Sequence, residues 1–161
     1  MRKQIISGLV LFVTLIFCFS MAPYATAGPA DEVLQVVVKF DRGFNTGDFD
    51  LIASVWGHSD EVTQFGLGKS GSFRTEGWKK TVPRFMRLTR LPKGTLRLSR
   101  SQPRVTLLGD DIAIFTSYDT LGVKPAPDAP RETWLCRSTL VLQKTQGEWL
   151  IVHGHSSRFP K

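Results

Sequence analysis

The chain has 161 residues, with 21 lysines and arginines against 14 acidic residues and a formal net charge of +7. This length favours a single domain with a substantial core after any leader is removed. Nucleic acid is excluded as an expected partner because no motif interleaves aromatic with basic residues, and no cofactor is expected.

A secretory signal peptide is predicted at the N-terminus. Arg2 and Lys3 precede an apolar run over residues 5–19, and Ala25-Thr26-Ala27 places small residues at the −3 and −1 positions of a cleavage site. The run is shorter than the roughly 20 residues that cross a bilayer. We therefore expect cleavage after Ala27, a periplasmic or secreted protein that meets the membrane only during export, and a mature domain over residues 28–161.

The start of the mature chain is predicted to be helical. Apolar residues recur at helical spacing over residues 31–45, and Asn45-Thr46-Gly47 ends that helix. Asp48 can cap a second, short helix. A short strand over 62–65 and a glycine-rich loop over 66–71 are predicted to follow.

A third helix is predicted to begin after Arg74, and Pro83 is expected to kink it or delay its start. The rest of the chain is predicted to form strands, with a bend at Pro103 and a hairpin turn at Gln146-Gly147, over residues 95–101, 105–108, 112–120, 133–145 and 148–156. Helices followed by adjacent antiparallel strands predict an α+β domain with its helices on one face of a curved sheet.

Nine basic residues are spread over residues 79–104. One interpretation is contact with an anionic surface. The other is a solvated helix face plus a solvated strand face, which the absence of a dense run of like charges favours. The residues are Lys79, Lys80, Arg84, Arg87, Arg90, Lys93, Arg97, Arg100 and Arg104.

The last strand, GEWLIVHGHSS over residues 147–157, resembles the closing strand of SnoaL-like members of the nuclear transport factor 2-like superfamily. Similar segments precede it in the same order, namely GDFDLIASVW (47–56), HSDEVTQFGLG (58–68), RTEGW (74–78) and LLGDDIAIF (107–115). The resemblance covers roughly residues 31–159. It implies a nuclear transport factor 2-like cone, with three N-terminal helices packed on a curved, mainly antiparallel sheet. It also implies room for a small ligand at the wide end and a homodimer formed through the outer sheet face.

A second branch of that superfamily, the association domain of a calcium/calmodulin-dependent kinase, has a similar last strand with two cleft arginines. Aligned on Trp149, these positions fall at Leu140 and Ser156, so an anion-binding cleft of that type is not expected. The alignment predicts that one face of strand 133–145 looks into the cone, with Trp134, Cys136, Ser138, Leu140 and Leu142. Cys136 is predicted to be a buried structural thiol.

The superfamily holds several activities on one scaffold, so three functions stay open. The first is a binding protein for a small, mainly apolar molecule. Its expected lining is aromatic with a few polar anchors, drawn from Phe40, Trp56, Phe65, Trp78, Tyr118, Trp134, Ser138 and Ser156. The second is an isomerase or hydrolase with Asp119 or His155 as the base. The third is a non-catalytic dimerisation module.

Strict alternation along the last strand predicts that Trp149, Ile151, His153 and His155 share one face. Trp149 should then be largely buried. No metal is expected, because a metal site wants three or four ligands and no further set accompanies the two histidines. We expect the histidines to serve structure or dimer contact more than catalysis.

Overall fold

A computed structural model describes residues 28–68, 71–126 and 128–159. The predicted signal peptide, with its cleavage motif, lies outside these residues. Within the described part of the chain, no helix is long and apolar enough to span a membrane.

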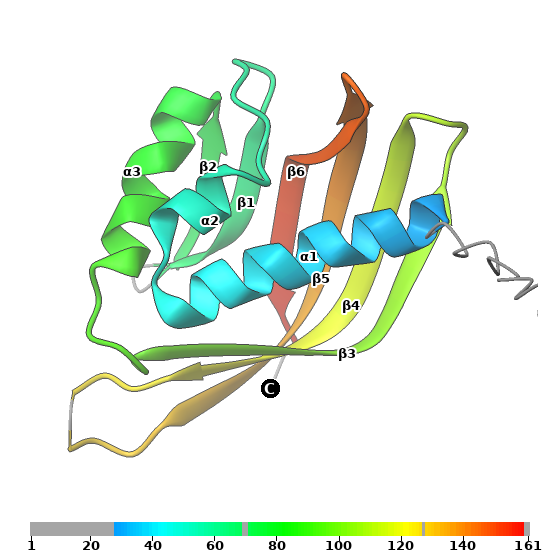
Figure 1. Ribbon diagram of the computed structural model, residues 1–161. Coiled ribbons are helices and arrows are strands. Elements are labelled where there is room, and N and C mark those ends of the chain that lie inside the picture. The colour runs from blue at the N-terminus through cyan, green and yellow to red at the C-terminus, as the bar shows by residue number, and fades with distance from the viewer. Residues whose placement is uncertain (1–27, 69–70, 127, 160–161) are drawn as a thin grey trace, which may run out of the picture.

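The longest helix, α1 (Pro29–Thr46), follows the predicted apolar periodicity and buries Val33, Val37 and Phe40. It ends where the sequence indicates, because Gly47 adopts a left-handed conformation with φ 71° and returns its N–H to the carbonyl of Gly43. The helix lies across the sheet (Figure 1), and its buried face therefore supplies much of the core.

Two shorter helices complete the layer above the sheet. In α2 (Phe49–Ala53), the predicted cap is present, since the Asp48 carboxylate accepts a hydrogen bond from the Leu51 amide at 2.9 Å. The helix α3 (Trp78–Thr89) begins five residues before Pro83, so the expected delay of its start is wrong. A proline at that position removes one helical hydrogen bond, which burial of Phe85 can offset.

Six strands form one mixed sheet in the order β2-β1-β6-β5-β4-β3 (Figure 1). Neighbouring strands pair antiparallel, except that β1 and β6 run parallel. The strands are β1 (Thr63–Gly68), β2 (Gly71–Glu76), β3 (Leu96–Leu107), β4 (Ile112–Val123), β5 (Glu132–Thr145) and β6 (Glu148–Arg158). The expected bend near Pro103 is a break in the β3–β4 register between Ser101 and Arg104.

The glycine-rich stretch differs from its prediction as a loop. It belongs to a β1–β2 hairpin, in which Phe65 pairs with Arg74. Gly66 lies inside β1 because the Phe73 ring covers it: a Cβ there would lie 2.7 Å from Phe73 Cε1. The glycine thus marks a close approach within a strand. The helix α3 therefore follows a hairpin, where a single short strand was predicted before it.

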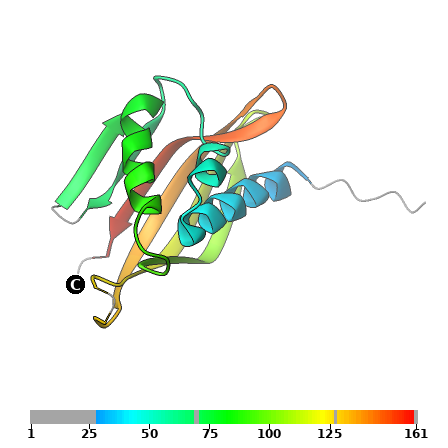
Figure 2. The same cartoon turned by 60° about the vertical axis from the view of Figure 1, so that its left-hand side comes forward.

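The helices cover one face of the sheet, the inner face, and leave the opposite, outer face uncovered (Figures 1 and 2). The predicted inner residues of β5 are confirmed, since Cys136, Ser138, Leu140 and Leu142 are buried. The core forms between this face and the helices, and its largest fully buried side chains are Trp56, Phe85, Phe115, Ile52, Leu142 and Ile151.

The strict alternation predicted for β6 is wrong. Leu142 pairs with Ile151 but Val141 pairs with His153, so Val152 is an extra residue on β6. Such a bulge reverses the alternation beyond it. Trp149 is buried as predicted, but it lies with Ile151 on the inner face and not on the face opposite the cone, where alternation had placed both. His153 and His155 lie on the outer face.

Candidate functional site

Polar residues cross the inner face in two adjacent rows, which we call the polar band. One row follows the cross-strand pairs from Arg100 through Asp119 to Cys136. The other joins Ser117, Ser138 and Ser156. The next row toward the deep core is apolar, with Phe115, Leu140 and Gly154. The band is therefore a polar strip set in an apolar interior.

A charged cluster anchors the polar band. Arg100 Nη1 lies 3.1 Å from Asp119 Oδ2 and 3.1 Å from Ser117 Oγ. The Asp119 carboxylate also accepts hydrogen bonds from Ser117 Oγ, at 2.6 Å, and from Ser138 Oγ. Asp119 is only 4% exposed. This buried carboxylate is therefore hydrogen-bonded on both oxygens, as a buried charge requires.

The helix α1 adds a second carboxylate to the cluster. Arg100 Nε donates to Asp41 Oδ1 at 2.9 Å and to Oδ2 at 2.8 Å. Burial raises the pKa of Asp41, and the charge of Asp119 raises it further, against the lowering effect of the Arg100 hydrogen bond. One guanidinium thus faces two carboxylates, and Asp41 is the carboxylate that burial pushes toward the protonated state.

The thiol of Cys136 lies beside this cluster and is 2% exposed. Burial raises the pKa of Cys136, and the negative charge of Asp119 raises it further. A thiol held in its neutral form is a poor nucleophile, so the structure agrees with the predicted structural role.

Aromatic residues flank the polar band on both sides. Toward the deep core, Trp56 packs against Phe85 with ring centroids 5.1 Å apart and against Phe40 at 6.1 Å. Beyond the charged row, the guanidinium of Arg158 lies 3.2 Å from the Trp134 ring centroid. Aromatic rings therefore lie on either side of a few fixed polar groups.

The structure brings six of the predicted site residues to this interior. Asp119, Ser138 and Ser156 belong to the polar band, and Trp134 lies next to it on β5. Phe40 and Trp56 are buried above it and contact each other.

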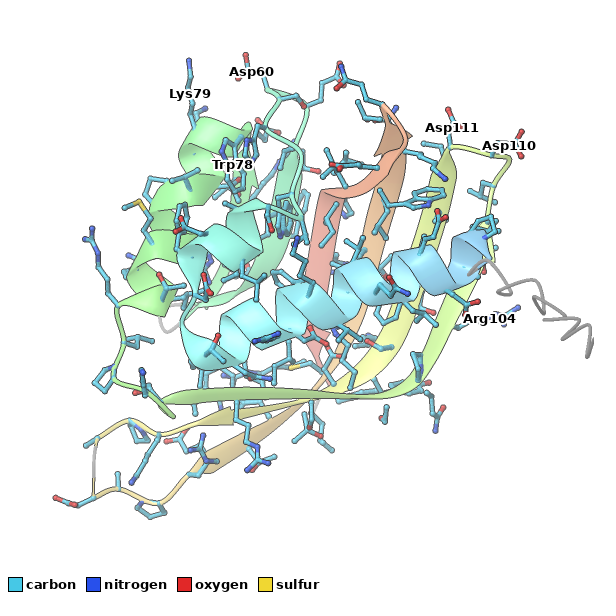
Figure 3. All side chains as sticks on the ribbon, in the orientation of Figure 1. Asp60, Trp78, Lys79, Arg104, Asp110 and Asp111 are labelled. Carbon is cyan, nitrogen blue, oxygen red and sulfur yellow. The ribbon has the colours of Figure 1, made fainter. Side chains whose placement is uncertain are left out.

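Four other predicted site residues lie elsewhere, namely Phe65, Tyr118, Trp78 and His155. Phe65 is on the outer face, where its ring lies 5.8 Å from His153 and 6.2 Å from His155. Tyr118 is also on the outer face and is 47% exposed. Trp78 begins α3 and stacks on His58 at 4.5 Å. Figure 3 shows Trp78 near Asp60 and Lys79, at the far end of α3 from the β4–β5 hairpin.

The outer face carries its own set of contacts. His153 Nδ1 lies 2.6 Å from Thr63 Oγ1. Burial lowers the pKa of His153, and the neighbouring His155 lowers it further. Among the described residues, no group of three or more His, Cys, Asp or Glu side chains could hold a metal ion.

A model of the SnoaL-like domain matches residues 33–161, which is most of the chain. The chain belongs to the SnoaL-like domain family. This agrees with the resemblance of the last strand and with the mixed six-stranded sheet. A search of curated proteins finds no match to the chain.

Solved structures share the fold of this SnoaL-like domain at low sequence identity. A candidate dehydratase of the nuclear transport factor 2-like family from Streptomyces avermitilis has a TM-score of 0.71 and 16% identity, over 81% of this chain and 96% of that one. A nuclear transport factor 2-like superfamily protein from Salmonella enterica serovar Typhimurium has a TM-score of 0.67 and 17% identity, over 82% of this chain and 92% of that one. The association domain of the calcium/calmodulin-dependent kinase II of C. elegans has a TM-score of 0.61 and 18% identity, over 78% of this chain and 92% of that one. These likenesses establish the fold.

Two residues of the charged cluster of this SnoaL-like domain were not predicted from sequence. Arg100 was interpreted as part of a solvated basic stretch, and Asp41 lies in an ordinary helical pattern. A usable signal was present on β4, where Ser117 and Asp119 continue the buried alternation of Ala113 and Phe115. Polar residues at buried positions need partners, which points to an arginine on a neighbouring strand.

Proposed function

We propose that this SnoaL-like domain binds a small, mainly apolar molecule between its helices and the inner face of its sheet. The polar band carries the proposal, because ligand sites are mostly apolar with a few positioned polar groups. Phe40, Trp56 and Trp134 would supply apolar contact. Ser138 and Ser156 would supply hydrogen bonds.

The same geometry favours binding over acid–base catalysis. A general base needs an oxygen or nitrogen free to take a proton from the substrate. Asp119 already accepts hydrogen bonds from Arg100, Ser117 and Ser138, and His155 lies on the outer face. An isomerase or hydrolase that uses either residue stays a prediction, and the polar band does not support it.

Native mass spectrometry of the protein purified from its own compartment tests the proposal. We expect a bound organic molecule in the wild type. Ser156→Val should reduce its occupancy, because the added methyl groups enter the interior. Ser157→Val is the matched control, since the neighbouring Ser157 lies on the outer face, where its hydroxyl accepts a hydrogen bond from Arg137 Nε at 3.2 Å. Equal occupancy in the two variants would count against an interior site.

A homodimer through the outer sheet face is the second candidate, and exposed apolar side chains favour it. Leu135 is 60% exposed, and Tyr118 and Phe159 form a ring contact beside it with centroids 5.6 Å apart. The fold is shared with an association domain, which lends further support. Sedimentation should give a dimer for the wild type and a monomer for Leu135→Glu; a wild-type monomer would refute it.

We also propose that the protein is exported. The charged, apolar and cleavage regions of residues 1–27 support this. The mature N-terminus should be Gly28 in the periplasmic or secreted fraction, as read by mass spectrometry. Recovery of intact Met1 in the membrane fraction would refute it.

A further inference from the structure

Two buried polar atoms have no hydrogen-bond partner within the described residues on the inner side of the molecule. They are the indole donor Trp56 Nε1 and the amide acceptor Gln64 Oε1. Trp56 is 2% exposed. A buried donor or acceptor without a partner destabilises a fold, so each such atom calls for an explanation.

The two side chains approach the same point of the sheet. A Cβ on Gly154 would lie 3.0 Å from Trp56 Cη2, so the indole rests directly on this glycine. Gln64 is the cross-strand partner of Gly154 in the parallel β1–β6 pair, and neighbouring strands lie about 4.8 Å apart. Its neighbours Thr63 and Phe65 contact His153 and His155 on the outer face. Alternation therefore turns Gln64 to the inner face.

The chemistry of the pair selects one kind of group. One atom donates a hydrogen bond and the other accepts one, and a hydroxyl does both. A ketone would leave the Gln64 acceptor without a donor. A carboxylate would do the same, and neither side chain offers it a positive charge. A protonated amine cannot accept from the indole.

We propose that Trp56 and Gln64 form a hydroxyl-recognition site for an apolar alcohol or phenol. Trp56 Nε1 donates to the ligand oxygen, and the ligand hydroxyl donates to Gln64 Oε1. The inference rests on the proposed small-molecule function and names the class of molecule bound. It places the hydroxyl beside Gly154, next to the polar band.

Trp149 provides a matched control within the same fold. It is as deeply buried as Trp56, but its indole Nε1 donates to Glu32 Oε2 at 3.0 Å. Trp149→Phe therefore removes an indole donor that the protein itself uses. Trp56→Phe removes the donor that we assign to the ligand, and Gln64→Leu removes the acceptor at a similar volume.

The experiment compares 2-naphthol with 2-methylnaphthalene, which are similar in size and differ in the hydroxyl. Calorimetric titration of the full domain should show 2-naphthol binding about tenfold more tightly to the wild type, as expected for two net hydrogen bonds. In Trp56→Phe and in Gln64→Leu the two probes should bind with about equal affinity, whereas Trp149→Phe should keep the preference for 2-naphthol. Circular dichroism checks that each variant is folded. If only one of Trp56→Phe and Gln64→Leu folds, that variant alone is enough for the test.

Equal affinity of the wild type for both probes would overturn the hydroxyl site and leave the small-molecule function standing. Survival of the preference in the folded Trp56 and Gln64 variants would do the same. Binding of neither probe would also overturn the hydroxyl site. A bound organic molecule in the native mass spectrum of the purified protein would then still support the small-molecule function, and its absence would count against that function as well.

Discussion

Ile151 and His153 are two residues apart on β6, and their side chains lie on opposite faces of the sheet. Ile151 is fully buried opposite Leu142, whereas His153 pairs with Val141 and contacts Thr63 on the outer face. The extra residue between them is Val152. The bulge lets one strand contribute to the core and then present two histidines outward.

The bulge also turns Gly154 toward Trp56, and this contact is open to mutation. In Gly154→Ala, the new Cβ would lie 3.0 Å from Trp56 Cη2 and 3.5 Å from Leu140 Cδ2. We expect the free energy of unfolding to fall by about 1–3 kcal/mol through overpacking, measured by urea denaturation. His155→Ala is the control, because the adjacent side chain is exposed on the outer face and should change stability by less than about 0.5 kcal/mol. Similar small losses in both variants would contradict the packing.

Most strands could be predicted from sequence, because alternation and turn residues are local signals. The hairpin at Gln146-Gly147 is an example, with φ of 52° and 87° at its two residues. The bulge could not be predicted, because Leu150, Ile151 and Val152 are all apolar. Their sequence therefore does not show which of them face the core or where the facing changes. The strand β2 was missed because the glycines at 66, 68 and 71 resemble a loop until Phe73 is seen to cover Gly66.

The site was predictable only in part. The inner face of β5 followed from its alternation, and Asp119 stood out as a carboxylate in a strand. Its partner Arg100 is 19 residues away, and Asp41 is 59 residues from Arg100. Pairing over such separations depends on how α1 crosses β3 and has no local pattern. The placement of Phe65 and Tyr118 failed for a simpler reason, since an aromatic residue in a strand can face either side.

Arg100 should be the most sensitive charged position. Arg100→Met would leave the buried Asp119 and the half-buried Asp41 without their guanidinium, and breaking a buried pair in this way costs about 3–5 kcal/mol. Arg104→Met is the matched control: Arg104 is on the same strand, beyond the register break, and its exposed side chain points to solvent (Figure 3). Unfolding in urea should show a large loss for the first variant and almost none for the second. Equal losses would mean that the charged cluster does not anchor the fold.

The raised pKa of Asp41 predicts an acid-side stability effect. Its folded pKa lies above the ordinary value of 3.8, so the folded state holds a proton that the unfolded state has released between these values. This contribution to stability is fully present below pH 3.8 and is lost as the pH rises through the folded pKa.

Urea unfolding of the wild type and of Asp41→Asn, from about pH 3 to about pH 7, measures this effect. The stability of the wild type relative to the variant should decrease as the pH rises. A relative stability that increases with pH would show that the Arg100 hydrogen bond, and not burial, dominates the pKa of Asp41.

The outer histidines predict an effect of the opposite sign. Burial and His155 place the folded pKa of His153 below its ordinary 6.5, so the folded state prefers the neutral ring. The stability from this preference is present above pH 6.5 and is lost as the pH falls through the lowered pKa. His153→Gln combined with His155→Gln should remove this loss while weakening folding or dimerisation, because the contacts of His153 to Thr63 and Phe65 change. Unfolding and sedimentation across this pH window are the measurements.

The same double variant separates the two faces of the sheet. Ligand occupancy of its folded fraction should equal that of the wild type in native mass spectrometry, because neither histidine reaches the inner face. Ser156→Val provides the comparison, since it should lower occupancy while leaving the dimer intact. A double variant that melts normally and keeps its dimer mass, yet loses its ligand or a measurable turnover, would tie the outer face to chemistry and make His155 the leading candidate for the base.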